Sequence, residues 1–113
     1  MTKTLFVSEV YEYTHKLAQR LQENYNTQYP NSLRETFEIV EGRKYYKINS
    51  QNSVHCFVDK KTGDVYKPAS WSRPAAIVRY NLLDSDSRSQ CYARADWAGG
   101  YLYLRYSSWQ KRV

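Results

Sequence analysis

A length of 113 residues with 42% hydrophobic side chains suffices for one domain with a modest core and leaves little room for two. Lysine and arginine number 17 against 11 acidic residues, and the net charge of +6 favours polyanionic or acidic partners. No apolar run approaches the roughly 20 residues that a membrane-spanning helix needs, which excludes that class of protein. We therefore predict a single α+β domain over residues 1–113.

Apolar residues recur at helical spacing in the first part of the chain. Spaced three or four positions apart, they form one stripe: Phe6, Val10, Tyr13, Leu17 and Leu21. This pattern predicts an amphipathic helix over residues 3–24 that packs on a sheet. Residues 24–33 are rich in Asn, Tyr, Thr and Ser with one proline, which is typical of a loop.

Short alternating segments then predict two hairpins. The expected strands cover residues 36–40, 44–48, 54–58 and 65–67. Gly42 lies in the first reversal, and Gly63 can take the positive φ that closes the second. Pro68 has no amide hydrogen to donate, so regular pairing is expected to stop there.

The rest of the chain predicts a helix, a loop and a last strand. Ser72, Arg73 and Pro74 resemble a helix start, which favours a short helix over residues 75–83. A polar loop over residues 84–90 is expected next, leading to a helical turn that ends near Arg94. Alternating Tyr and Leu predict a strand over residues 101–106 with Leu102 and Leu104 facing the core, before a frayed basic tail.

Together these patterns predict an α+β fold. Its N-terminal amphipathic helix packs on an antiparallel sheet of four to five short strands, with a short helix after the central hairpin. The two cysteines, Cys56 and Cys91, form no Cys-x-x-Cys pair, and no apolar signal sequence opens the chain. We therefore expect free thiols and a reducing compartment.

Catalytic and metal chemistry find little support in the sequence. A metal site would need several of the scattered donors His15, His55, Asp59, Cys56 and Cys91 to converge. Alternation along a strand sends His55 and Cys56 to opposite faces, which argues against a shared ion and against a histidine-activated cysteine. Asp59, Asp64 and Lys67 have the residue types of a magnesium nuclease, but their spacing is also that of a charged turn. We expect no enzyme, no metal and no cofactor.

Binding through a basic and aromatic surface is favoured instead. Residues 51–113 hold most of the positive excess, with ten basic residues against five acidic ones. Cationic side chains pair with phosphates, and aromatic rings stack on unpaired bases. The predicted binding residues are Lys67, Trp71, Arg73, Arg79, Arg88 and Arg94. In the competing interpretation, Trp71 packs the hairpin against the short helix and the arginines are scattered over solvated surface.

From Val54 onward the chain resembles small proteins of tailed bacteriophages. The shared features are a Val-His-x-Phe-Val-Asp strand, a Thr-Gly-Asp turn, a Lys-Pro-Ala-x-Trp segment, Pro-Ala with Arg-x-Asn, and a closing Ala-Gly-Gly-Tyr-Leu-Tyr-Leu. Ile77 departs from the usual pattern, which weakens the case for a continuous basic helix. The resemblance implies a phage origin and expression in a bacterial host, and it brings no established activity.

These observations predict a small phage accessory protein that binds nucleic acid or a host nucleic-acid complex, for instance as an anti-defence factor. The expected location is the cytoplasm of the host bacterium, or the virion. The alternative is a virion structural or assembly protein that uses tyrosine-rich faces as subunit contacts; twelve tyrosines supply them.

Overall fold

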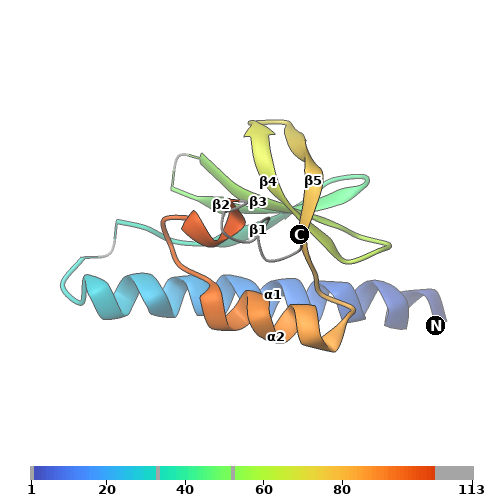
Figure 1. The fold of residues 1–113 in the computed structure, drawn as a ribbon, viewed down its shortest axis with the longest axis horizontal. Helices are drawn as coiled ribbons and strands as arrows, with labels where there is room; N and C mark the ends of the chain where they lie inside the picture. The colour runs from blue at the N-terminus through green and yellow to red at the C-terminus, as the bar shows by residue number, and fades with distance from the viewer. Residues whose placement is uncertain (1, 33, 52, 104–113) are drawn as a thin grey trace, which may run out of the picture.

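The structure, a computed structural model, describes residues 2–32, 34–51 and 53–103, with side chains described from Glu9 onward. In chain order its elements are α1 (Thr2–Gln28), β1 (Glu38–Glu41), β2 (Tyr45–Ser50), β3 (Ser53–Asp59), β4 (Asp64–Ser70), β5 (Arg73–Asn81), α2 (Ser85–Arg94) and the 3-10 helix η1 (Gly100–Leu102). The two α-helices form one layer beneath the twisted sheet (Figure 1). This arrangement confirms the predicted α+β fold and its helix-on-sheet packing.

The apolar stripe of α1 forms one side of the core. Val10, Leu17 and Leu21 are buried, as the helical spacing predicts. The helix continues to Gln28, which corrects the loop predicted from residue 24. Tyr25 extends the stripe by one more turn, is buried, and its hydroxyl lies 2.8 Å from Ser32 Oγ. This extra packing stabilises a segment whose Asn and Thr content alone favours a loop.

The other side of the core is one face of an antiparallel sheet with strand order β1-β2-β3-β4-β5. Tyr46 pairs with Val58, and Ile48 pairs with Cys56. All four side chains are buried in the same cluster as the α1 stripe. β1 pairs with β2 and β3 pairs with β4, both antiparallel, which confirms the two predicted hairpins.

The helix predicted over residues 75–83 is wrong, because Arg73–Asn81 is strand β5. Pro68 does not end β4 either: it lies opposite Pro74, where the register of the pair is irregular and neither residue has an amide hydrogen to donate. Trp71 and Ser72 are the turn between the strands. The Ser-Arg-Pro sequence is thus compatible both with a helix start and with a turn followed by an edge strand. The β-branched residues Ile77 and Val78 favour the strand.

The polar loop predicted over residues 84–90 is helical instead. Asn81 Oδ1 accepts hydrogen bonds from the backbone N–H groups of Leu83 and Asp84, and α2 begins at Ser85. Cys91 is the buried residue of α2, and a single buried position gives no apolar stripe from which the sequence could predict a helix. Its anchor comes from elsewhere in the fold, since the Tyr92 hydroxyl donates to the backbone oxygen of Tyr13 in α1 at 2.8 Å.

The last predicted strand is not formed over the residues that the structure describes. Gly100–Leu102 is a 3-10 helix, although Leu102 is buried as expected. Leu104 and the rest of that prediction, including the tail, lie outside the described residues. In the described part of the chain, no helix has the length and apolar character to cross a membrane.

Candidate functional site

The sheet face that points away from the helices carries a cluster of rings around one lysine. Phe57 and Tyr66 are paired across β3 and β4, and Tyr45 of β2 lies edge-on to both rings. Lys47 Nζ lies 5.6 Å from the Phe57 ring centroid and 5.7 Å from that of Trp71, and it donates a hydrogen bond to the Trp71 backbone oxygen at 3.0 Å. Lys47 thereby joins the turn of the β4–β5 hairpin to β2.

Trp71 is exposed in this arrangement. The residue keeps 58% of its surface accessible, because the turn projects beyond the sheet (Figure 1). The neighbouring Arg73, the first residue of β5, is also exposed. The competing interpretation, in which Trp71 packs the hairpin against a short helix, is therefore wrong. A ring and a cation are available to a partner at this turn.

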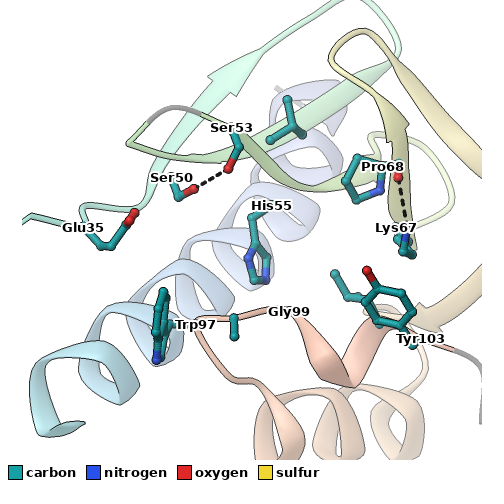
Figure 2. A pocket seen from close by; sticks show the side chains of 12 residues that line it. Glu35, Ser50, Ser53, His55, Lys67, Pro68, Trp97, Gly99 and Tyr103 are labelled. Carbon is teal, nitrogen blue, oxygen red and sulfur yellow. Dashed lines mark hydrogen bonds between the residues drawn. The ribbon is translucent and has the colours of Figure 1, made fainter. Parts of the chain in front are cut away.

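On the other side of β4 lies a pocket with a cavity of about 360 Å³. Figure 2 shows His55 in its middle, with Glu35 and Trp97 to one side and Lys67 and Tyr103 to the other. The remaining lining residues are Ser50, Ser53, Val54, Pro68, Ala98, Gly99 and Leu102. Segments far apart in the sequence thus meet here, from the end of β2 to η1.

A β-bulge puts His55 into this pocket. Cys56 lies opposite Ile48 and Val54 lies opposite Asn49, so His55 is an extra residue in β3. Regular alternation would send its ring away from Cys56. Both residues instead lie on the side of Tyr101, since His55 Nε2 is 2.8 Å from the Tyr101 hydroxyl and Cys56 is buried in the same core cluster as Tyr101. The opposite-face argument from the sequence is therefore wrong at this position.

Burial keeps the His55 ring neutral. Only 8% of the residue is exposed, and this burial lowers the pKa of its imidazole from 6.5 to about 4, against a smaller opposing effect of the Asp96 carboxylate. Burial also raises the pKa of Tyr101 well above its ordinary value, so its hydroxyl keeps its proton. Two neutral groups therefore share the hydrogen bond.

The direction of this hydrogen bond depends on the imidazole tautomer. Among the described residues, His55 Nε2 is the hydrogen-bond partner of the Tyr101 hydroxyl, and either group can donate. In the tautomer in which the hydroxyl donates, the single proton of the neutral imidazole sits on Nδ1, which has no partner in the described part of the protein. In that tautomer Nδ1 is an N–H donor beside the pocket.

The segment beside the ring is held in place by Asp96. Its carboxylate accepts hydrogen bonds from the backbone N–H groups of Ala98 (3.0 Å) and Tyr101 (3.2 Å). Gly99 has a φ of +86°, and a Cβ there would lie 3.7 Å from His55 Cε1. Glycine at this position lets the backbone adopt the left-handed turn and approach the ring.

A second pairing of a lysine and a ring borders the pocket. Lys67 Nζ lies 4.7 Å from the ring centroid of Tyr103 and 3.4 Å from the backbone oxygen of Pro68. Tyr103 is 61% exposed. Together with Lys47 and Trp71, this gives one cation–ring pair on each side of β4.

The six predicted binding residues do not form one cluster. Lys67 borders the pocket, and Trp71 and Arg73 lie at the hairpin turn. Arg79 is used within the fold, since its Nε donates to the backbone oxygen of Leu102 at 2.6 Å and its Nη1 donates to that of Ile77.

The two arginines of α2 lie in the helical layer (Figure 1). Arg88 Nη1 donates to the backbone oxygen of Leu82, and its guanidinium carbon lies 4.1 Å from the Tyr13 ring centroid. Arg94 is exposed in the last turn of the helix. Arg88 and Arg94 therefore do not share the hairpin surface.

The residues weighed for catalysis have other contacts. Asp59 Oδ1 accepts the backbone N–H groups of Lys61 and Thr62, and Asp64 Oδ1 accepts the Asn81 amide at 2.6 Å. Both thiols are buried, and burial raises the pKa of Cys91 to about 12. Within residues 2–32, 34–51 and 53–103, no three His, Cys, Asp or Glu side chains gather as a metal site.

Sequence reasoning missed the pocket residues His55, Trp97, Tyr101 and Tyr103. The adjacent glycines 99 and 100 signal a close backbone approach, but nothing local says what is approached. The bulge depends on strand pairing and leaves no pattern in a single strand.

A model for a family of unknown function (DUF7717) matches residues 2–104. No curated protein and no solved structure matches the chain.

Proposed function

Because the chain belongs to the family of unknown function DUF7717, its role is inferred from its own surface, and we propose that it binds single-stranded nucleic acid without catalysing a reaction. The observation that carries the proposal is the pair of exposed rings, Trp71 and Tyr103, each with a lysine ammonium within 6 Å of its centroid. Exposed rings stack on unpaired bases, and nearby cations neutralise phosphates.

The geometry of the β4–β5 hairpin favours binding of single-stranded nucleic acid over binding of a duplex. Lys67 and Trp71 are four residues apart along β4 and its turn, a distance of about 13 Å at the rise of an extended chain. The two rings lie on different sides of this narrow hairpin, so a flexible strand that crosses it can stack on both. A stiff duplex would expose no base faces to them. The net charge of +6 supports a polyanionic partner.

The direct test measures the binding of single-stranded DNA and RNA oligonucleotides by fluorescence anisotropy at two salt concentrations. Wild type is expected to bind, with an affinity that falls as salt rises. Trp71→Ala and Tyr103→Ala are each expected to weaken binding about 5- to 150-fold, since a stacked base contributes about 1–3 kcal/mol. Duplex oligonucleotides of the same length should bind more weakly.

Lys16→Ala is the matched control. Lys16 is exposed on α1 in the helical layer, and its loss changes the net charge by the same amount as Lys67→Ala. We expect Lys67→Ala to weaken binding more than Lys16→Ala. Equal effects of Lys67→Ala and Lys16→Ala would show that binding depends on net charge alone. Absence of oligonucleotide binding at low salt would contradict the proposal.

A second role, in virion structure or assembly, is supported by the edge strand β5. Ile77 and Val78 expose 54% and 40% of their surface there, and in the described chain β5 pairs on one side only, with β4. Exposed apolar edge strands are common subunit contacts. Mass spectrometry of purified phage particles tests this role, which requires the protein to be present in them.

We further propose a bacteriophage origin and action in the host bacterial cytoplasm, on host nucleic acid or on a host defence complex that contains it. The support is the motif resemblance from Val54 onward and the lack of a paired-cysteine pattern. Tagged protein expressed in bacteria and purified with and without nuclease treatment tests it. Loss of co-purified partners after nuclease treatment is expected if nucleic acid bridges the contact.

A further inference from the structure

The pocket around His55 has the properties of a ligand site that the hairpin surface does not explain. A cavity of about 360 Å³ falls in the range of small-ligand pockets, about 300–1,000 Å³. His55 lies in the middle of the pocket and is 8% exposed, and its Nε2 contacts the Tyr101 hydroxyl. Its Nδ1 has no hydrogen-bond partner among the described residues. A ring nitrogen that a bulge places beside a cavity, with no protein partner, is open to a hydrogen bond with a ligand that enters the cavity.

The charges around the cavity favour a neutral ligand. Lys67 contributes one positive charge to the lining, Glu35 contributes one negative charge, and the carboxylate of Asp96 lies close enough to act on His55. The lining therefore has no positive excess for a phosphate. The imidazole is itself neutral at pH 7, so it offers an ordinary N–H donor rather than a cation.

Aromatic rings form two walls of the pocket. Tyr103 and Trp97 line opposite sides of the pocket, with His55 between them (Figure 2). A planar, neutral heterocycle with carbonyl or ring-nitrogen acceptors matches this combination of one donor and aromatic walls. Nucleobases have these properties, and bases of a single strand are unstacked and available.

We propose that this pocket receives one unstacked nucleobase, with an acceptor atom of the base bonded to His55 Nδ1–H. The proposal rests on the proposed binding of single strands, because the Lys67–Tyr103 pair at the pocket rim would hold the adjoining backbone. The base enters between Tyr103 and Trp97, and Gly99 leaves the space beside the imidazole open. The chain thereby binds one base by an edge contact and others by stacking alone.

Nuclear magnetic resonance on the ¹⁵N-labelled full chain tests the site with uridine, adenosine and inorganic phosphate as separate probes. Long-range ¹H–¹⁵N spectra of the histidines should show His55 protonated on Nδ1. Either nucleoside is expected to shift that nitrogen and the Gly99 amide, whereas phosphate leaves both unchanged. Shifts caused by phosphate and by neither nucleoside would overturn the inference.

A pocket-filling variant connects the site to strand binding. Ala98 lines the pocket and is exposed, so Ala98→Trp fills its mouth without entering the core. The matched control is Ala93→Trp, at an exposed position on α2. We expect Ala98→Trp to abolish the nucleoside shifts and to weaken oligonucleotide binding at least about fivefold, the loss of one bound base.

The outcomes separate this inference from the proposed function. If Trp71→Ala weakens strand binding and Ala98→Trp does not, the base pocket is overturned and the strand surface stands. If strands do not bind but a nucleoside still shifts His55 and Ala98→Trp removes that shift, the proposed function fails and the heterocycle site is upheld. If neither strands nor nucleosides bind, both are overturned.

Discussion

His55 shows how a single extra residue changes the chemistry of a strand. In a regular strand its ring would face away from Cys56, but the bulge between Ile48 and Asn49 brings both residues to Tyr101. The ring is then buried, neutral and bonded at Nε2. Burial lowers its pKa, and Nδ1 lies beside the pocket without a protein partner among the described residues.

Stability should therefore depend on the protonation of His55. The pKa of the His55 imidazole is about 4 in the folded protein, against 6.5 where the ring is not buried, as in the unfolded chain. The unfolded chain binds the extra proton between these values, so the stabilisation is complete above pH 6.5 and is lost as pH falls toward 4. Urea unfolding at pH 7.5 and pH 5.0 should show a decrease of about 2 kcal/mol from this group.

His55→Gln isolates the contribution of the ring, because an amide oxygen can still accept the Tyr101 hydroxyl hydrogen. The other ionisable groups are the same in both proteins, so the difference between the two pH dependences belongs to His55. The variant is expected to be less stable than wild type at pH 7.5. Its free energy of unfolding should fall less than that of wild type when the pH is lowered to 5.0. Parallel decreases in both proteins would contradict a buried neutral imidazole.

At the scale of elements, the β3–β4 turn depends on Gly63. Its φ is +77°, its N–H donates to the Asp59 oxygen at 2.9 Å, and its oxygen accepts the Leu82 N–H at 2.8 Å. The turn thus connects the central hairpin to the segment between β5 and α2. A side chain at this position meets both a backbone that L-residues rarely adopt and a packed neighbour.

Gly63→Ala should therefore destabilise the protein. The left-handed backbone costs about 1–2 kcal/mol for an L-residue, and the new Cβ would lie 3.0 Å from Leu83 Cγ and 3.2 Å from Leu83 N. We expect a loss of at least about 1–2 kcal/mol in the free energy of unfolding, measured with urea. Gly100→Ala is the control, since its Cβ would meet Asp96 Oδ2 at 3.6 Å and its φ is not positive; an equal loss there would contradict the explanation.

β5 and α2 show where local sequence signals mislead. Ser72 and Pro74 are compatible with a helix start and with a hairpin turn followed by an edge strand, and only pairing with β4 decides between them. In α2 the sequence is polar with weak helix propensity. Its helix forms because Asn81 and Ser87 hold its entry, where the Asn81 N–H donates to Ser87 Oγ at 2.8 Å, and because Tyr92 anchors it to α1.

For the whole molecule, one buried cluster joins the helical layer to the sheet. Leu17 of α1, Ile48 of β2 and Leu82 after β5 are all fully buried in it. Because these side chains share neighbours across the layers, we expect the helices and the sheet to unfold together. The pocket and the hairpin surface lie at the margin of this shared core.

Leu17→Ala tests this coupling. Truncating a fully buried leucine is expected to lower the free energy of unfolding by about 2–5 kcal/mol. Helix content, followed by far-ultraviolet circular dichroism, and tryptophan fluorescence should shift to the same lower urea midpoint. Separate midpoints for the two signals would show that α1 and the sheet are not one cooperative unit.

The sequence alone determined the elements that carry a strong periodic pattern. The apolar stripe of α1, the alternation in β2 and the glycine turn at Gly63 are local signals, and the structure confirms each of them. It also indicated Lys67 and Trp71 as binding residues, and in the structure each lies near a ring or a lysine. The segment that follows was predicted as a helix and is strand β5. Such patterns suffice because side-chain periodicity follows from backbone geometry.

Only the tertiary structure decided the pocket. The position of His55 depends on a bulge that arises between two strands, and its pKa depends on burial by Tyr101 and Gly99 from the far end of the chain. The separation of Arg88 and Arg94 from Trp71 likewise depends on which layer each element joins. Long-range pairing and burial are properties of the assembled fold, so no local pattern in the sequence records them.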